Sequence, residues 1–238
     1  MRFYRRLTSF QAISFDLDDT LYANRDVMVA TEKSMVAYFE RVLASYNHEQ
    51  QVFDRCFWWA FRAQAIKTEP SLAHEITDVR RQTYRLGILS LTGDQELSVS
   101  LAEQALAHFI EKRSDFKVPD SVHALLARLA MRYPLIAISN GNVDAKAIGI
   151  EKYFCHMLHA GNGKLTKPNV DMFTRAANQL GLPLSQILHV GDCGHADVFG
   201  ALRSGMQSVW LSCYDVGKPL RVVPHVEITD IAQLERLV

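Results

Sequence analysis

The sequence lacks several features that would assign a chain to a particular class of protein. It has no uninterrupted apolar run of membrane-spanning length, and no such run follows the basic residues near its start, so we expect neither a membrane span nor a secretory signal. The 26 lysines and arginines equal the 26 aspartates and glutamates, so no overall field favours nucleic acid or an anionic membrane. Any anion that the protein handles must therefore be held by a local site.

Cysteine is scarce, and its spacing is not that of a metal site. The four cysteines show no Cys-x-x-Cys pair and no Cys/His ligand spacing: Cys56, Cys155, Cys193 and Cys213. We expect free, buried or semi-buried thiols in a reducing compartment, and hence a soluble, cytoplasmic protein. There is also no basic stripe with interleaved aromatic residues, so no nucleic-acid partner is expected. No feature indicates an oligomeric state.

Apolar residues are plentiful, at 48% of 238 residues, which is ample for a packed interior. Short apolar runs typical of strands lie at 12–15, 135–138, 187–190 and 208–211. Helical patterns separate them, at 122–129 and at 170–180, where Gly181-Leu-Pro183 gives a stop signal. This alternation predicts an α/β fold with a Rossmann-like, doubly wound and mainly parallel sheet.

Residues 25–116 interrupt this alternation. Helical spacing dominates there, and one apolar helical face is formed by Met28, Met35, Phe39 and Val42. The segment has room for about four helices of average length, and it contains no convincing strand. We therefore predict a core domain made of residues 1–24 and 117–238, with a helical domain inserted at 25–116.

Three acidic residues follow the first predicted strand, in Asp16-Leu-Asp18-Asp19-Thr20. Strand alternation places the side chains of Asp16 and Asp18 on the same side. Two carboxylates so close repel each other, and a divalent cation beside them relieves the repulsion. One can then act as nucleophile while the other, partly protonated, serves as acid and base. The alternative is a polar turn, which three acids in four residues disfavour.

Ser139, Asn140 and Gly141 follow the second predicted strand. A hydroxyl and an amide at a strand end can donate hydrogen bonds to phosphate oxygens, and glycine allows the backbone to approach closely. The same residues are also typical of an ordinary turn. By itself this cluster favours the turn.

A lysine cluster precedes the helical pattern at 170–180. Pro168 is suited to the opening of that helix, which would direct Lys167 toward the strand ends as a point cation for phosphate and aspartate charge. Lys164 is a competing candidate, and either lysine could simply be solvated.

The fourth cluster is Gly191-Asp192-Cys193-Gly-His195-Ala-Asp197. Asp192 follows a strand directly and offers a hard oxygen ligand for magnesium. Asp197, in the first turn of the next helix, lies close enough to orient that ligand or the lysine. The alternative is an N-cap aspartate with an acid in the first helical turn. Cys193 and His195 could suggest zinc, but we interpret them as loop residues.

In this order, each at a strand end, the four clusters resemble the four motifs of the haloacid dehalogenase-like superfamily. Those motifs are DxDx[TV], a strand-end Ser or Thr, a Lys often followed by Pro, and GDxxxxD. The corresponding residues are Asp16-Leu-Asp18-Asp-Thr20, Ser139-Asn140, Lys167-Pro168 and Gly191-Asp192 through Asp197. The resemblance spans nearly the whole chain, and the insertion resembles the helical cap of the first type.

This resemblance implies a magnesium-dependent phosphomonoester hydrolase with an aspartyl-phosphate intermediate. Asp16 is the implied nucleophile, and Asp18 protonates the leaving oxygen and then deprotonates the hydrolytic water. Ser139, with Asn140 nearby, holds phosphoryl oxygens, and Lys167 balances their charge. Such positioning and charge compensation are what phosphoryl transfer demands.

The implied metal site contains the Asp16 carboxylate, the Asp18 main-chain carbonyl and Asp192, with Asp197 supporting. Asp18 also separates the activities within the superfamily, because a halide leaving group needs no proton and the dehalogenases lack this aspartate. A phosphatase is therefore favoured over a 2-haloacid dehalogenase. A phosphomutase stays an alternative, and a catalytically inactive binding module is disfavoured because it has no use for Asp18.

The predicted partner is a small-molecule phosphate. Five segments look closely like one bacterial branch of the superfamily: 1–4, 13–22, 139–142, 203–206 and 224–228. That branch contains phosphatases acting on flavin mononucleotide (FMN) and on the ribitylaminouracil phosphate of riboflavin biosynthesis; a sugar phosphate is the alternative substrate. Trp58 and Trp59 could stack on a planar ring, although packing between the cap's own helices is favoured.

Overall fold

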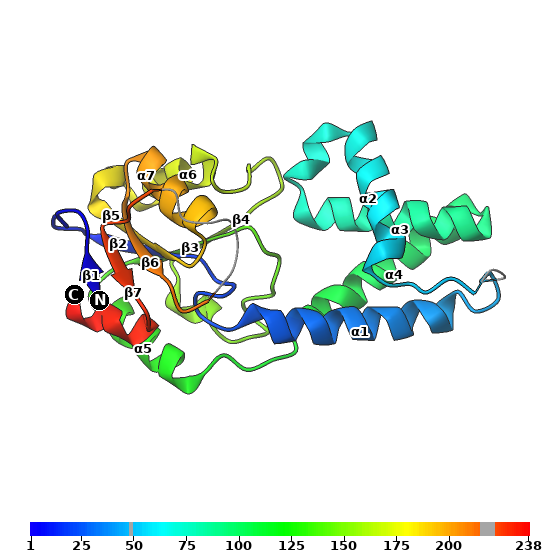
Figure 1. The fold of residues 1–238 in the computed structure, drawn as a ribbon, viewed down its shortest axis with the longest axis horizontal. Helices are drawn as coiled ribbons and strands as arrows, with labels where there is room; N and C mark the ends of the chain where they lie inside the picture. Colours follow the sequence, from blue (N-terminus) through cyan, green and yellow to red (C-terminus); the bar gives the residue numbers. More distant parts are fainter. Residues whose placement is uncertain (48–49, 215–221) are drawn as a thin grey trace.

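A seven-stranded sheet forms the larger part of the computed structural model, which describes residues 1–47, 50–214 and 222–238. The strand order is β1-β7-β6-β5-β2-β3-β4 (Figure 1). The strands are β1 (Arg2–Phe3), β2 (Ala12–Phe15), β3 (Leu135–Ser139), β4 (His156–His159), β5 (Ile187–Gly191), β6 (Gln207–Leu211) and β7 (Val226–Ile228). Neighbouring strands are parallel except β1, which pairs antiparallel with β7. The sheet is thus mixed, and the predicted α/β, mainly parallel, Rossmann-like fold is confirmed.

The predicted strands at 12–15, 135–138, 187–190 and 208–211 correspond to β2, β3, β5 and β6. Strands β1, β4 and β7 were not predicted from the sequence. Two of these have only two or three residues, and β4 is an edge strand in which only Leu158 is fully buried. Short or half-exposed strands carry too few apolar residues to produce a recognisable run.

Helices cover both faces of the sheet (Figure 1). Helix α5 (Asp120–Ala130) contains the helical pattern predicted at 122–129 and packs on one face through Val122, Leu125, Leu126 and Leu129. Helices α6 (Val170–Leu180) and α7 (Gly200–Ser204) pack on the other. Helix α6 ends at Gly181, whose φ of 64° is the left-handed conformation that glycine adopts readily. It begins at Val170, so Pro168 precedes this helix and does not open it.

Four further helices lie to one side of the sheet (Figure 1). They are α1 (Asn24–Val42), α2 (Arg55–Thr68), α3 (Ile76–Thr92) and α4 (Gln95–Arg113). We call this part the helical lobe. Its buried aromatic and aliphatic side chains, among them Phe39, Tyr84 and Phe109, form a cluster separate from those of the sheet. Among the described residues, no helix is long and apolar enough to cross a membrane.

Of the two candidate stacking tryptophans, Trp58 packs inside the lobe. Its ring lies 4.4 Å from Phe39 and 5.1 Å from Tyr84, centroid to centroid, and its indole N–H donates to the Phe53 carbonyl at 3.1 Å. Trp59 is 62% exposed, so the packing role favoured for both tryptophans is wrong for this one. Trp58 therefore has the packing role that the sequence favoured.

Candidate active site

The carboxyl ends of β2, β3 and β5 meet at one edge of the sheet. Strand β2 lies between the other two, with Phe15 opposite Ala137 of β3 and Val190 of β5, so the residues that follow each strand come together. They line a pocket of about 260 Å³ with residues from two nearby loops: Asp16, Asp18, Asp19, Ser139, Asn140, Gly141, Lys167, Asp192, Cys193, Ala196 and Asp197. All seven residues predicted for the site are in this set.

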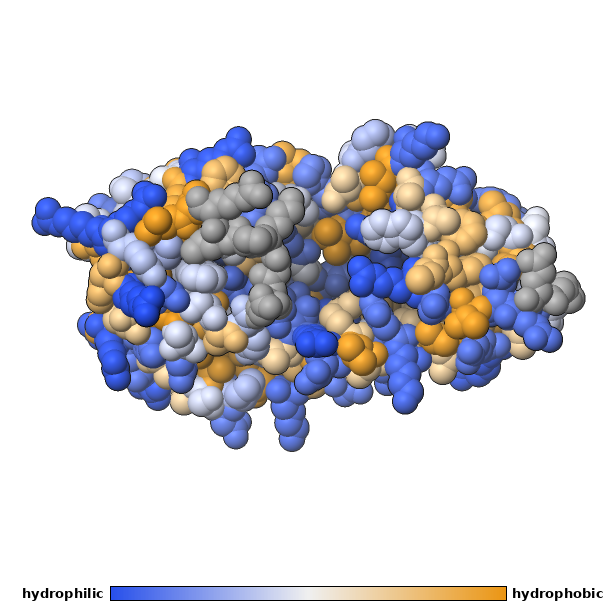
Figure 2. Space-filling model, viewed as in Figure 1, coloured by the Kyte–Doolittle hydropathy of each residue, from blue (hydrophilic) through white to orange (hydrophobic). Residues whose placement is uncertain are grey.

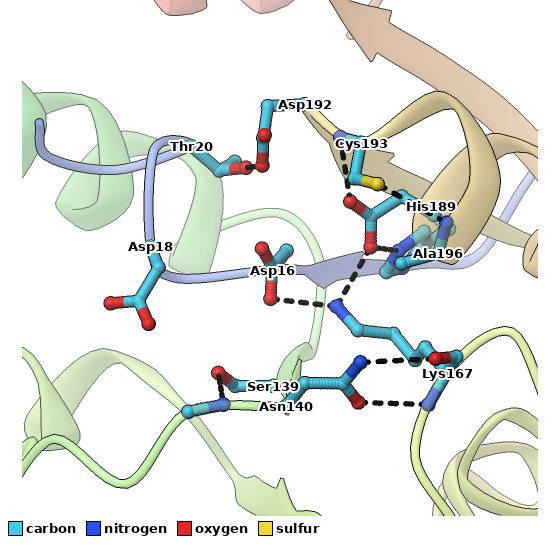
Figure 3. Close-up of polar contacts among 12 residues, drawn as sticks. Asp16, Asp18, Thr20, Ser139, Asn140, Lys167, His189, Asp192, Cys193 and Ala196 are labelled. Carbon is cyan, nitrogen blue, oxygen red and sulfur yellow. Dashed lines mark hydrogen bonds and ion pairs between the residues drawn. The ribbon is translucent and has the colours of Figure 1, made fainter. Parts of the chain in front are cut away.

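Lys167 links two of the carboxylates (Figure 3). Its Nζ donates to Asp16 Oδ1 at 2.6 Å and to Asp197 Oδ1 at 2.7 Å. The side chains of Lys167 and Asp197 are almost completely buried. Lys164, the competing candidate, lines a separate cavity with Arg175. The structure therefore brings Lys167, and not Lys164, to the strand ends.

Burial sets the protonation of these groups. It raises the pKa of Asp16 well above its usual range despite the opposing charge of Lys167. Burial and the nearby Asp197 likewise raise the pKa of Asp192 to about 7. Burial opposes the charged form of Asp197 too, but Lys167 and His189 outweigh it and lower this pKa to about 2. One lysine thus faces three carboxylates, which leaves an excess of negative charge for a cation to balance.

Asp197 has further partners that the sequence analysis did not identify. His189 of β5 contacts Asp197 Oδ1 through Nε2 at 3.1 Å, and its Nδ1 lies 2.8 Å from Ser14 Oγ. The Cys193 N–H donates to Asp197 Oδ2 at 3.0 Å. A Cβ at Gly191 would come within 2.3 Å of the Asp197 carboxyl carbon, so glycine is required there. His189 could not be identified from the sequence, because it lies within a buried apolar strand and has no local motif around it.

The second cluster holds the lysine loop in place. Asn140 Oδ1 accepts from the Lys167 N–H at 2.8 Å, and its Nδ2 donates to the Lys167 carbonyl at 3.0 Å. Its side-chain amide therefore positions Lys167 in this structure, while the Ser139 hydroxyl faces the pocket and accepts from the Gly141 N–H at 2.9 Å (Figure 3). A Cβ at Gly141 would lie 2.5 Å from Asp18 Oδ2, so this glycine permits the close approach of the two loops.

Asp18 has two partners that sequence reasoning missed. The Tyr22 hydroxyl donates to Asp18 Oδ1 at 2.7 Å, and Arg113 Nη2 forms an ion pair with the same oxygen. Arg113 is the last residue of α4, and its side chain is only 2% exposed. Tyr22 is near Asp18 in sequence, whereas Arg113 is 95 residues away and ends an otherwise ordinary helix. Only the fold brings it to the site.

Hard oxygen donors for a metal ion are present. Asp16, Asp192 and Asp197 each offer a carboxylate oxygen, and these oxygens all lie within 4.8 Å of one another. Hydrogen bonds among the described residues engage both oxygens of Asp197 but only one oxygen each of Asp16 and Asp192. The donor set fits a hard divalent cation, with Asp16 and Asp192 free to ligate.

Cys193 and His195 do not belong to that group. Cys193 Sγ accepts from the Ala196 N–H at 3.3 Å, and the His195 ring stacks on Phe199 at 5.5 Å. Both contacts are local, but His195 lies within the helical turn Gly194–Phe199, which Cys193 caps, and not in a loop as predicted.

Comparison with known proteins agrees with this geometry. The model of the haloacid dehalogenase-like hydrolase family matches residues 10–205, which include every strand end of the pocket. The chain belongs to this family. It is 35% identical to the 5-amino-6-(5-phospho-D-ribitylamino)uracil phosphatase YigB of Escherichia coli, over 100% of both chains. It is 24% identical to the pyrimidine 5'-nucleotidase YjjG of the same organism, over 94% of this chain and 96% of that one.

A solved structure of the family has nearly the same fold. The 2-haloacid dehalogenase from Pseudomonas syringae pv. tomato DC3000 superposes with a TM-score of 0.88 at 25% identity, covering 96% of this chain and 97% of that one. The protein is therefore an enzyme of this hydrolase family. Its full-length match to a named phosphatase places it with the phosphatases, the phosphoric monoester hydrolases of the family.

Proposed function

We propose that the protein hydrolyses a small phosphate monoester with the help of Mg²⁺, through an aspartyl-phosphate intermediate on Asp16. The observation that carries this proposal is the environment of the Asp16 carboxylate. Lys167 binds one of the Asp16 oxygens. The carboxylate oxygens of Asp16 and Asp192 lie within 4.8 Å of each other, close enough to share one metal ion. Asp18 lines the same pocket two residues further along the chain.

In the first step the free Asp16 oxygen attacks phosphorus, and the bond from phosphorus to the ester oxygen breaks. Asp18 gives its proton to that departing oxygen, because an alkoxide is a poor leaving group without one. Lys167 stabilises the negative charge on the phosphoryl oxygens, and the Ser139 hydroxyl can donate to one of them. The phosphoryl group is then an acyl phosphate on Asp16.

In the second step a water molecule attacks the phosphorus and releases inorganic phosphate. Asp18, now ionised, takes a proton from this water, and the bond between Asp16 and phosphorus breaks to restore the carboxylate. Arg113 and Tyr22 keep the Asp18 side chain beside the pocket during both steps, since both hold the same carboxylate oxygen.

Magnesium fits the donor set, with Asp16 and Asp192 as carboxylate ligands, the Asp18 main-chain carbonyl completing them and Asp197 holding Lys167 and the loop of Asp192. When bound, the ion supplies positive charge that lets the carboxylate and a phosphate dianion approach each other. The raised pKa values of Asp16 and Asp192 support this assignment, because a cation beside them would stabilise their ionised forms.

For the substrate we infer a ribityl phosphate such as FMN or 5-amino-6-(5-phospho-D-ribitylamino)uracil, supported by the 35% identity to the Escherichia coli enzyme. A sugar phosphatase or phosphomutase of the same fold is the second candidate. The chain is also similar to a dehalogenase, but we favour dehalogenation less than phosphate hydrolysis. A departing halide needs no proton, so Asp18 and the residues that position it would have no function in that reaction.

We further infer a domain division in which residues 25–116 form a cap over a core of 1–24 and 117–238. It is supported by the separate hydrophobic cluster of the helical lobe. The lobe also contacts the segment that precedes Lys167, where Glu75 accepts from the Asn162 N–H at 2.6 Å and His74 Nδ1 lies 2.7 Å from Thr166 Oγ1. The thiols of Cys56, Cys155 and Cys213 are exposed, so the prediction that they are buried or semi-buried is wrong for these three. Free thiols still support the predicted cytoplasmic location.

Phosphate release from FMN, the ribitylaminouracil phosphate and simple sugar phosphates, each with Mg²⁺ and with a chelator, tests the proposal. We expect turnover that needs the metal and is highest with the ribityl phosphates. Near-normal phosphate release by Asp16→Asn would rule out the nucleophile. Equal rates on all esters would reject the substrate class alone, and chloride release from a 2-haloacid would favour the dehalogenase.

A further inference from the structure

The helical lobe contains a second and larger cavity, of about 680 Å³, here called the lobe cavity. Helices α1, α2 and α3 form its walls with Phe109 of α4, and its lining includes Met28, Trp58, Arg62, Arg80, Tyr84 and Phe109. Sites for organic ligands measure roughly 300–1,000 Å³. The pocket at Asp16, at about 260 Å³, is large enough for a phosphoryl group but not for a whole cofactor-sized ester.

Two helices connect the lobe cavity with the site. Phe109 lines the cavity, and Arg113, one helical turn or about 6 Å further along α4, binds Asp18. Ile76 also lines the cavity, and the adjacent Thr77 receives a hydrogen bond from Asn142 Nδ2 at 3.4 Å, beside Gly141 of the site. The molecule is hollowed where the helical lobe meets the sheet (Figure 2). The two cavities therefore lie within the reach of one small ester.

The charge of the lobe cavity is unbalanced. Four cationic residues line it, Lys33, Arg55, Arg62 and Arg80, against the two acids Glu32 and Asp54. The Asp54 carboxylate already accepts from the Cys56 and Phe57 N–H groups at the start of α2. No ion pair forms on either Arg62 or Arg80 among the described residues. The cavity thus offers donors that lack anionic partners.

Arg80 is the best-defined of these donors. Its guanidinium lies 3.6 Å over the Phe109 ring, and its Nη1 contacts the Tyr84 hydroxyl at 3.2 Å. Its Nε is buried and has no hydrogen-bond partner among the described residues. Burial, together with the charge of Arg80, also lowers the pKa of Arg62. A buried donor without an acceptor is costly, so Arg80 keeps donor capacity that the described residues do not use.

The walls restrict the shape of such a ligand. The indole rings of Trp58 and Trp59 line the cavity and provide flat apolar surface, whereas the rings of Tyr84 and Phe109 are buried in its wall. The guanidinium groups provide donors in a plane. A small sugar covers less of this surface than a planar fused ring does, and a haloacid is far smaller than the cavity. A planar heterocycle with carbonyl acceptors at its edge satisfies both features.

We propose that the lobe cavity receives the leaving group of the phosphate ester, and that this leaving group is a planar, carbonyl-bearing heterocycle bound by Arg80 and Arg62. This proposal rests on the phosphatase function proposed above and adds the residues that select the substrate. Arg62 and Arg80 are then specificity-determining residues, since neither belongs to the pocket at Asp16.

The test compares two phosphate esters that share the ribityl group: FMN, and ribitol 5-phosphate, which lacks the ring. For Arg80→Met we expect kcat/KM with FMN to fall about 10- to 100-fold, with a smaller fall for Arg62→Met, while ribitol 5-phosphate changes less than about 2-fold. Arg85→Met is the matched control on α3, because Arg85 contacts Gln82 and does not line the cavity. Arg80→Lys, which keeps the charge without the planar donor, should recover only part of the loss. Thermal unfolding of each variant checks the fold.

Riboflavin binding, followed by flavin fluorescence on the Asp16→Asn protein, gives a readout that does not need turnover. Binding that weakens about 10-fold or more with the added Arg80→Met change supports the lobe cavity. Equal losses on both esters, or unchanged riboflavin binding, would overturn it. A wild-type enzyme that hydrolyses neither these esters nor the simple sugar phosphates but still binds riboflavin through Arg80 would reject the phosphatase function and keep the cavity as a ring site.

Discussion

The contact between Arg113 and Asp18 leads to a prediction that separates structure from catalysis. Replacing Arg113 by Met keeps the length of the side chain but removes the charge that faces the Asp18 carboxylate. The loss of one partner from a buried ion pair costs about 3–5 kcal/mol. Asp18 is 21% exposed and keeps Tyr22, so we expect the lower end of that range, about 3 kcal/mol. Chemical denaturation measures this change.

The catalytic effect follows from the position of Asp18. General acid–base catalysis contributes about 10²- to 10⁴-fold to the rate. When Asp18 loses the ion pair with Arg113, it should lose part of this contribution. We expect kcat to fall about 10- to 100-fold in Arg113→Met. In an Asp18→Asn background the same substitution should have almost no further effect on kcat, because its target is already gone. An equal fold-change in both backgrounds would show that Arg113 does not act through Asp18.

Three further predictions concern the rest of the site. The folded, metal-free protein holds a proton on Asp192 up to about pH 7, whereas the unfolded chain releases it near pH 4. Its free energy of unfolding should therefore fall as the pH rises from about 4 to 7; thermal unfolding in chelator should show this fall, Mg²⁺ should reverse it, and Asp192→Asn should reduce both effects, leaving the part that comes from the raised pKa of Asp16. Replacing His189 by Leu should cost about 1–3 kcal/mol in denaturation experiments and lower kcat, whereas His189→Gln, which can still donate to Asp197, should cost less; equal costs would contradict the hydrogen-bond role. Gly141→Ala should push Asp18 aside and lower kcat by about 100-fold with little change in KM; unchanged kcat would refute the close approach.

Sequence reasoning identified the residues of the site because they follow buried strands. Asp16, Ser139 and Asp192 each come directly after an apolar run, and parallel strands bring their carboxyl ends to one edge. Strand order alone then places them in one pocket. The seven predicted residues line it, although their catalytic roles stay predictions.

What the sequence could not provide are partners that depend on the packing of distant segments. Arg113 ends a helix of the lobe, and His189 occupies a strand position normally filled by an apolar residue. Neither has a local signal, because their hydrogen bonds reach Asp18 and Asp197 across the fold. The same reason applies to Asn140, whose side chain serves Lys167 in this structure.

The short strands β1 and β7 and the edge strand β4 were missed for a different reason. They extend the sheet on both sides of the site but hold few buried residues. Their place is set by pairing with neighbours and not by their own apolar pattern. None of them contributes to the pocket, so the prediction of the site did not depend on them.

The most direct test of the proposed chemistry is the covalent state of Asp16 during turnover. The enzyme is mixed with FMN and Mg²⁺, quenched in acid within one turnover, and digested for mass spectrometry of the peptide that contains Asp16. We predict that this peptide gains the mass of one phosphoryl group, that the gain disappears in Asp16→Asn, and that phosphate release disappears with it. Rapid phosphate release with an unmodified peptide, or with an active Asp16→Asn enzyme, would contradict the account.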